Sequence, residues 1–362
     1  MKRIRDLLDK GVDEGTFPGA VLLVAHRGNV DFLERSGFRS IIPRRLPMEK
    51  DTVFDLASLT KPLATTLGMM KLVEKGLIDL DQPLDKLLQT VPLRDKRALT
   101  PRLLLSHSAG LADWKPFYMK LVQFSPEFRK SILREQIIDL PFAYSPGTAC
   151  LYSDLGYMLL EWITEERTGE SMSSFLGRSF YDRMSIKKTF LGSENRPESI
   201  KIEQFAATED CPWRGKILRG EVHDENAYAL GGYSGHAGLF GTAEEVFAVA
   251  NLLREHYREE RDDFFSEATV REFFKKQNIV KDCTFALGWD TPSSENSSAG
   301  VYFSEHSVGH LGFTGTSLWM DLVKDVIVIF LTNRVHPTRE NEKIRAFRPL
   351  IHDTVMETLG LN

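Results

Sequence analysis

Strand-like segments lie near both ends of this 362-residue chain, and a long helical stretch separates them. The apolar run Gly19 to Ala25, the turn His26 to Asn29 and the run that follows predict a β-hairpin near the start. The runs Thr314 to Leu322 and Val326 to Thr332 predict a second hairpin near the end. A helical insertion between β-rich ends predicts one composite body with a second, helical lobe.

Helical patterns occupy most of the remaining sequence. Apolar residues at helical spacing predict a first helix before residue 13 and later helices at 243–256 and 342–359. The expected fold class is α+β, with an antiparallel sheet flanked by helices from the N- and C-terminal segments and an inserted, mainly helical lobe. We expect one domain over residues 1–362, in which 1–60 and 228–362 form an α/β lobe and 61–227 form the helical lobe.

Composition excludes several classes of partner. A hydrophobic fraction of 42% and a charged fraction of 27% are typical of globular proteins, and the net charge of -5 argues against nucleic-acid binding. No run approaches the roughly 18 apolar residues of a membrane span. We expect a small-molecule partner, with no nucleic acid and no membrane, and the oligomeric state stays open.

The N-terminal segment and the cysteines both favour a reducing compartment. The first residues lack the apolar segment of roughly 7 to 15 residues that a secretory signal requires. Cys150, Cys211 and Cys283 are widely spaced, odd in number and without CxxC spacing, which predicts buried free thiols. We therefore expect a cytoplasmic location, or a periplasmic one if a signal sequence has been removed.

The segment Ser58-Leu59-Thr60-Lys61 matches the pattern S-x-x-K. On a helix this spacing places an amine one turn from a hydroxyl on the same face, where the amine can activate the serine as a nucleophile. Leu59, Leu63 and Met70 give the following segment a helical apolar face. Ser185-Ile186-Lys187-Lys188 also matches, but it lies in a basic turn without such a face, so we interpret it as a chance match.

The sequence around Ser58, FDLASLTKPLATT, resembles the superfamily of serine β-lactamases, penicillin-binding proteins and class VIII esterases. Further blocks follow in the family's order across nearly the whole chain. They are Leu104 to Leu111 (LLSHSAGL), Tyr152-Ser153-Asp154, Asp224 to Thr242 (DENAYALGGYSGHAGLFGT), His310 to Thr316 (HLGFTGT) and Leu331 to Thr338 (LTNRVHPT). The resemblance implies a β-lactamase-like fold and a serine hydrolase.

The resemblance also implies roles for individual residues. Ser58 would be the nucleophile, Lys61 its activating amine, and Tyr152 the phenol that moves a proton between nucleophile and leaving group. His310-Leu311-Gly312 corresponds to the family's K-T-G or H-x-G triplet on an edge strand, where glycine allows a close approach of the substrate. Phe313 would donate its backbone amide, with that of Ser58, to an oxyanion hole.

No metal or cofactor is expected. His306 and His310 are four residues apart, but outside a helix that spacing does not bring two histidines to one ion, and no HExxH motif occurs. His107, His236 and Trp289 also stand in conspicuous segments. Structural roles explain all three about as well as catalytic ones, and we expect His107 to orient backbone.

Two departures from the family pattern bear on the substrate. Asp154 replaces the commoner asparagine, and its carboxylate near Lys61 should keep the amine cationic, so that Tyr152 takes more of the base role. An alternative, compatible with the first, is that Asp154 is the N-cap of a helix from 155 to 168. Leu311 removes a hydroxyl, and His310, only partly charged near pH 7, replaces a lysine. Arg334 could supply the missing cation or be a surface residue.

These departures argue against efficient hydrolysis of an anionic β-lactam. We expect a serine hydrolase that forms an acyl-enzyme on Ser58 and cleaves an ester or amide of an uncharged small molecule. Substrate contacts are expected from Asp154, His310, Gly312 and Phe313. One alternative is a β-lactamase or a carboxypeptidase-type penicillin-binding protein that acts on D-Ala-D-Ala. Another is a catalytically silent binding or sensor protein with the same fold.

Overall fold

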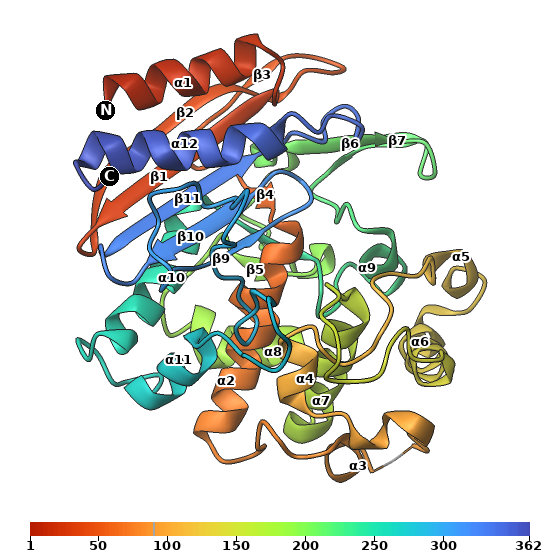
Figure 1. Cartoon of the computed structure of the whole chain (residues 1–362). Helices are drawn as coiled ribbons and strands as arrows, with labels where there is room; N and C mark the ends of the chain where they lie inside the picture. Colours follow the sequence, from red (N-terminus) through yellow and green to blue (C-terminus); the bar gives the residue numbers. More distant parts are fainter. Residues whose placement is uncertain (90) are drawn as a thin grey trace.

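A six-stranded antiparallel sheet lies at the upper part of the computed structural model, which describes residues 1–89 and 91–362 (Figure 1). The strand order is β3-β2-β1-β11-β10-β9, so the N-terminal hairpin pairs directly with the C-terminal one. The strands are β1 (Gly19–His26), β2 (Asn29–Ser40), β3 (Leu46–Pro47), β9 (Val308–Leu311), β10 (Ser317–Asp321) and β11 (Val326–Thr332). Both predicted hairpins are confirmed.

Helices cover both faces of the sheet, and β1 is therefore buried on both sides. Val21 and Leu23 belong to the core that the sheet shares with α10 (Ala243–Tyr257). Leu22 and Val24 belong to a second core with α1 (Lys2–Asp13) and α12 (Ile344–Leu359). Because side chains alternate between the two faces of a strand, this continuous apolar run can supply both cores.

The helical part of the molecule is built around α7 (Asp154–Thr168), in which every residue from Leu155 to Thr164 is buried. The other helices are α2 (Leu67–Glu74), α3 (Leu84–Leu87), α4 (Pro101–Leu105), α5 (Tyr118–Leu121), α6 (Pro126–Asp139), α8 (Met172–Leu176), α9 (Glu225–Ala229) and α11 (Glu267–Phe274). Within residues 1–89 and 91–362, no helix is long and apolar enough to cross a membrane. The α+β fold class is confirmed.

Short strands also occur in the segment 61–227, which we predicted to be mainly helical. β5 (Phe190–Leu191) joins β4 (Phe54–Asp55) and β8 (Leu239–Gly241) in a small sheet, and β6 (Ala207–Cys211) forms a hairpin with β7 (Lys216–Arg219). Strands this short show too little alternation for a periodic pattern to emerge. The boundaries of the two lobes stay a prediction.

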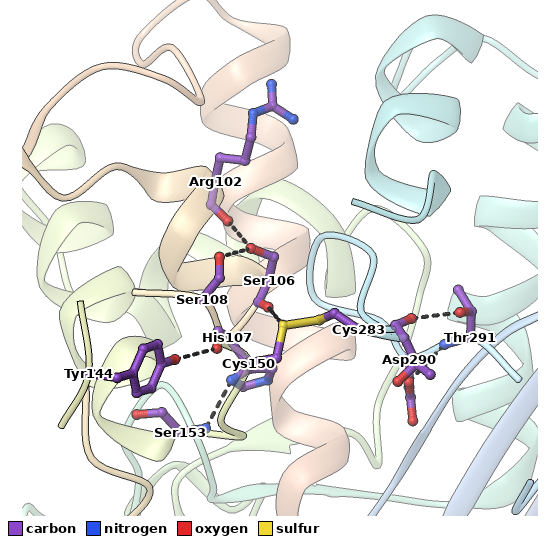
Figure 2. Close-up of a disulfide and its surroundings, with 11 residues drawn as sticks. Arg102, Ser106, His107, Ser108, Tyr144, Cys150, Ser153, Cys283, Asp290 and Thr291 are labelled. Atoms are coloured by element: carbon purple, nitrogen blue, oxygen red, sulfur yellow. Dashed lines mark hydrogen bonds between the residues drawn. A yellow bond between two sulfur atoms is a disulfide. The ribbon is translucent and has the colours of Figure 1, made fainter. Parts of the chain in front are cut away.

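Cys150 and Cys283 form a disulfide, so the prediction of three free thiols is wrong (Figure 2). The two residues are 133 positions apart, in the loop before α7 and the loop before β9, and their Cα atoms lie 6.1 Å from each other. Spacing along the chain carried no sign of this pairing, because only the tertiary fold brings the two loops together. Cys211 is free and buried, as expected.

Candidate active site

Ser58 lies in a tight 3-10 turn, Ala57–Leu59, that opens onto a large cavity. Ala57 has a φ of 49°, a conformation that residues with a side chain rarely adopt. The carboxylate of Asp55 holds this turn, since its Oδ1 accepts a hydrogen bond from the Ala57 amide at 2.9 Å. A π-helical stretch, Lys61–Thr66, then leads into α2, so the predicted helix near Ser58 begins with irregular turns.

Lys61 is fully buried and contacts Ser58. Its ammonium donates to Ser58 Oγ at 3.1 Å, to Asp154 Oδ1 at 2.7 Å and to the carbonyl oxygen of His236 at 3.3 Å. Burial alone would lower the pKa of Lys61, but attraction to Asp154 and Tyr152 outweighs burial and raises that pKa. Lys61 is therefore an ammonium group whose three protons all have acceptors.

Asp154 is the first residue of α7, and its carboxylate pairs with Lys61. The helix is capped by Ser153, whose hydroxyl accepts from the Gly156 amide at 3.4 Å. The alternative that Asp154 is the N-cap is therefore wrong by one residue. Its position in the first turn leaves the carboxylate free for Lys61 while keeping a negative charge at the positive end of the helix.

Tyr152 faces the cavity and leaves 36% of its surface exposed. Lys61 Nζ lies 4.7 Å from the centre of its ring, which also contacts His107 (4.6 Å) and His310 (5.8 Å). Burial of the hydroxyl raises the pKa of Tyr152, although the charge of Lys61 opposes this effect. The phenol consequently keeps its proton at neutral pH. His107 Nδ1 accepts from the Ser153 amide at 3.0 Å, so His107 orients backbone as expected (Figure 2).

His310 lies on β9, the edge strand of the sheet, at the cavity wall. Burial, with a smaller effect from the charge of Lys61, lowers the pKa of His310 to about 3. The expectation of a partly charged imidazole is therefore wrong, and His310 is neutral at pH 7. Its Nδ1 lies 2.8 Å from the Leu311 carbonyl oxygen, which fits a proton on Nδ1 and leaves Nε2 as an acceptor.

Gly312 follows β9 and lies against the Ser58 turn. A Cβ at this position would approach Thr316 Oγ1 to 2.0 Å and the Leu56 carbonyl oxygen to 2.6 Å, so no larger residue fits. Thr316 Oγ1 donates to that same carbonyl at 3.0 Å, and Thr314 Oγ1 donates to the Asp55 carbonyl at 2.8 Å. These bonds fix the loop that carries the Phe313 amide against the turn that carries Ser58.

His236 and Asp224 also belong to the site, and we did not include them in the predicted set. His236 Nε2 lies 2.9 Å from Asp224 Oδ1, and its backbone carbonyl accepts from Lys61. Burial opposes a charged imidazole, but Asp224 and Asp154 outweigh burial and raise the pKa of His236. Asp224 is the N-cap of α9, and its Oδ1 accepts from the Ala227 amide at 2.7 Å.

Asp154, Asp224 and His236 place ligand atoms within 4.8 Å of one another, which makes them the metal-binding candidate among the residues the structure describes. The ammonium of Lys61 already pairs with Asp154, and the imidazole of His236 already contacts Asp224. A divalent cation would have to displace Lys61 from a 2.7 Å contact. The donor set is therefore a poor fit for a metal ion, and the absence of metal and cofactor stays a prediction.

The cavity above Ser58 has a volume of about 790 Å³ and a wall that includes Arg334, Arg345 and Arg348. Arg348 is 7% exposed and donates to the carbonyl oxygens of Gly312 and Thr316, while its Nε has no partner. Desolvation, together with repulsion from Arg334 and Arg345, lowers the pKa of Arg348 to about 9. Within the described part of the chain, neither Arg334 nor Arg348 has a salt bridge, and Arg334 is buried. Trp289 packs against Phe274 and does not line this cavity.

Comparison with known proteins places this site in a family. A family model described as Beta-lactamase matches residues 4–352. The N-acetylmuramyl-L-alanine amidase of Bacillus subtilis (strain 168) is 30% identical over 93% of this chain and 81% of its own length.

Two solved structures share the fold. EstCE1, a hydrolase with promiscuous acyltransferase activity, has a TM-score of 0.75 and 21% identity, with 96% of this chain and 98% of that chain covered. The octameric penicillin-binding protein homologue from Pyrococcus abyssi has a TM-score of 0.75 and 19% identity, covering 100% of this chain and 78% of that chain. The expected β-lactamase-like fold is confirmed. The chain therefore belongs to the Beta-lactamase family and is a hydrolase of the serine β-lactamase and penicillin-binding type.

Proposed function

We propose that the chain is an amidase that forms an acyl-enzyme on Ser58 and releases the peptide from muramyl-peptide fragments of the cell wall. The observation that carries the proposal is the 3.1 Å contact between Lys61 Nζ and Ser58 Oγ, beside Tyr152 at the floor of the cavity. This arrangement supplies a nucleophile, a fixed positive charge and a phenol that retains a proton for the leaving group.

The proposed reaction needs no group outside the chain except water. Ser58 Oγ attacks the carbonyl carbon, and its proton passes to Tyr152 while Tyr152 gives its own proton to the amide nitrogen. The C–N bond breaks, the peptide leaves as an amine, and an ester remains on Ser58. Water then attacks this ester, and its proton returns to Ser58 through Tyr152. Lys61 stays an ammonium and stabilises negative charge on Ser58 Oγ and on the Tyr152 hydroxyl oxygen.

An oxyanion hole from the amides of Ser58 and Phe313 fits the fixed loops described above. The tetrahedral intermediate carries a negative charge on the former carbonyl oxygen, and each donor to such an oxygen lowers the barrier by roughly 3 kcal/mol. His310 is neutral and Asp154 is occupied by Lys61. Neither one supplies a positive charge for a carboxylate of the substrate.

The arginines of the cavity wall support an anionic substrate, which changes our expectation of an uncharged one. Among the described residues Arg348 has no ion-pair partner, and its Nε–H is unsatisfied, so a substrate carboxylate could offset the cost of burying it. A muramyl peptide offers such carboxylates on its peptide part. The name of the Bacillus subtilis relative points to the same class of amide bond.

The disulfide supports a location outside the cytoplasm, in place of the cytoplasmic one. Structural disulfides persist in oxidising compartments, where cell-wall fragments also occur. Cys150 is two residues before Tyr152, and Cys283 is two residues before Phe285, whose ring contacts both Tyr152 and His107. The cross-link therefore fixes the segment that carries the proposed proton donor.

Replacing both Cys150 and Cys283 with serine is expected to lower the free energy of unfolding by about 2 to 4 kcal/mol, because the cross-link restricts the unfolded chain. Urea unfolding of the variant and of the parent protein measures this difference. The Cys211→Ala variant retains the disulfide and is the control. Added reductant should lower its free energy of unfolding by as much as it lowers that of the parent protein. Three reactive thiols in the unreduced, unfolded parent would show that the disulfide is absent and would remove the argument for an oxidising compartment.

The proposed function is tested with muramyl dipeptide, p-nitrophenyl acetate and nitrocefin as parallel substrates. We expect release of free dipeptide from muramyl dipeptide, and a muramyl ester on Ser58 in mass spectra of rapidly quenched samples. Turnover of nitrocefin should be slower, because His310 and Leu311 replace the groups that hold a β-lactam carboxylate in relatives. Rapid nitrocefin turnover without any cleavage of muramyl dipeptide would favour the β-lactamase alternative and refute the amidase.

A further inference from the structure

Four aromatic residues form a continuous row that begins at the wall of the cavity with Trp114. The ring of Trp114 lies 6.5 Å from Tyr118, Tyr118 lies 4.7 Å from Trp213, and Trp213 lies 5.8 Å from Tyr228. The four come from separate segments: the loop before α5, α5 itself, the β6–β7 turn and α9. Trp114, Trp213 and Tyr228 leave 39%, 42% and 36% of their surfaces exposed. Large aromatic surfaces left open in this way mark a binding site more often than a fold requirement.

A buried arginine holds the outer half of this row. The guanidinium of Arg214 lies 4.0 Å from the ring centre of Tyr228 and 5.5 Å from that of Trp213. It also donates to the carbonyl oxygens of Val222, His223 and Asp224 and pairs with Glu221. Because these acceptors are backbone atoms of one segment, the rings are fixed before any ligand arrives. Such preorganisation reduces the entropy lost on binding.

The same contacts connect the row to the active site. Trp114 lines the cavity together with Ser58 and Tyr152. Asp113, next to Trp114, accepts from the Asp154 amide through its carbonyl at 2.8 Å. Asp224 connects the other end of the row to the active site. Its backbone carbonyl accepts from Arg214, and its carboxylate contacts His236. A ligand on the rings is therefore held at a fixed position relative to Ser58.

We propose that the row Trp114, Tyr118, Trp213 and Tyr228 is a saccharide subsite that binds the sugar part of the substrate. A pyranose ring has an apolar C–H face that covers an aromatic ring, and hydroxyl groups at its edge that need polar partners. Charged side chains alternate with the rings, with Lys115 beside Trp114 and Arg214 beside Trp213. This mixture suits a polyhydroxylated ligand better than an acyl chain. The inference rests on the proposed function, because it assigns the sugar half of the muramyl peptide to this surface.

Substrate discrimination tests the subsite. In Trp213→Ala, we expect the ratio of kcat/KM for muramyl dipeptide to kcat/KM for p-nitrophenyl acetate to fall about tenfold, the effect of roughly 1.4 kcal/mol of lost binding. Trp114→Ala should lower the ratio similarly, and Trp213→Phe should restore most of it because it keeps a ring. Phe128→Ala is the matched control, since Phe128 is an exposed aromatic residue on α6 outside the row. An unchanged ratio in both tryptophan variants would overturn the proposal.

Direct binding separates this inference from the proposed function. Chitotriose, a chain of N-acetylglucosamine without any peptide, should quench the tryptophan fluorescence of the parent protein, and Trp213→Ala should lose the quenching. Absence of muramyl dipeptide cleavage with retained chitotriose binding would refute the amidase and support the subsite. Cleavage of muramyl dipeptide with no binding of chitotriose, or binding of phosphatidylglycerol vesicles through the same rings, would refute the subsite.

Discussion

Ser58→Ala is expected to lower kcat/KM at least about 10,000-fold on every substrate that the protein cleaves, the scale seen when a catalytic serine is removed from other hydrolases. The reason is that an alanine side chain cannot form the ester, whereas the cavity and the loop of Phe313 stay in place. Initial rates on p-nitrophenyl acetate and on muramyl dipeptide measure the loss. Mass spectra of the variant should show no acyl adduct.

Ser185→Ala is the matched control, because Ser185 begins the second S-x-x-K match. Ser185 is exposed in a turn after the π-helical stretch Gly177–Tyr181, and neither it nor Lys188 lines the cavity of Ser58. This variant should retain parental rates. Full activity in Ser58→Ala, with loss of activity in Ser185→Ala, would show that the nucleophile has been assigned to the wrong serine.

Asp154→Asn is expected to move the alkaline transition of the kcat/KM profile to lower pH by at least about one unit. A carboxylate next to Lys61 stabilises the ammonium, and next to Tyr152 it destabilises the phenolate, so it raises both pKa values. Neutral asparagine removes both effects, and both pKa values fall. The alkaline transition therefore moves to lower pH whether it reports the deprotonation of Lys61 or of Tyr152.

The same substitution should destabilise the protein. Lys61 is fully buried, and Asp154 is its ion-pair partner at 2.7 Å. Loss of one partner of a buried pair costs roughly 3 kcal/mol, which urea unfolding at pH 7 can measure. Asp139→Asn is a suitable control, since Asp139 pairs with Arg94 at the surface, where both side chains are more than half exposed. A pH profile identical to that of the parent would contradict the proposed influence of Asp154.

Much of the fold could be predicted from the sequence, because apolar residues recur at helical spacing or form continuous runs in most of its helices and strands. The run Gly19 to Ala25 is continuous and apolar, and it became the strand buried on both faces. The ordered family blocks also pointed to residues that meet in the structure. Ser58, Tyr152 and His310 line one cavity, and the buried Lys61 contacts Ser58 and Tyr152. Their catalytic roles stay predictions until the variants above are measured.

Other features depend on tertiary contacts that no local pattern encodes. Cys150 and Cys283 meet only after two distant loops fold against each other. The charge of His310 could not be predicted, because burial and the field of Lys61 determine its pKa. Arg348 was not singled out from the sequence, yet this side chain of α12 is buried and donates to the Gly312 carbonyl oxygen. Tertiary contact decided the first of these cases and burial the other two, and sequence alone gives neither.

The pairing of β1 with β11 has a consequence for the synthesis of this protein. When the ribosome has produced Ser58 and Lys61, the strands β9 to β11 have still to be translated, and the edge of β1 that will bind β11 is open. The turn of Ser58 also lacks its hydrogen bonds from Thr314 and Thr316 at that stage, because these residues are translated later. The apolar strand β1 is therefore exposed to aggregation until the segment that contains β11 has been translated. Enzymatic activity should therefore appear only after translation has passed β11. The helix α12, which lies beside α1 across the finished sheet, is translated after that point (Figure 1).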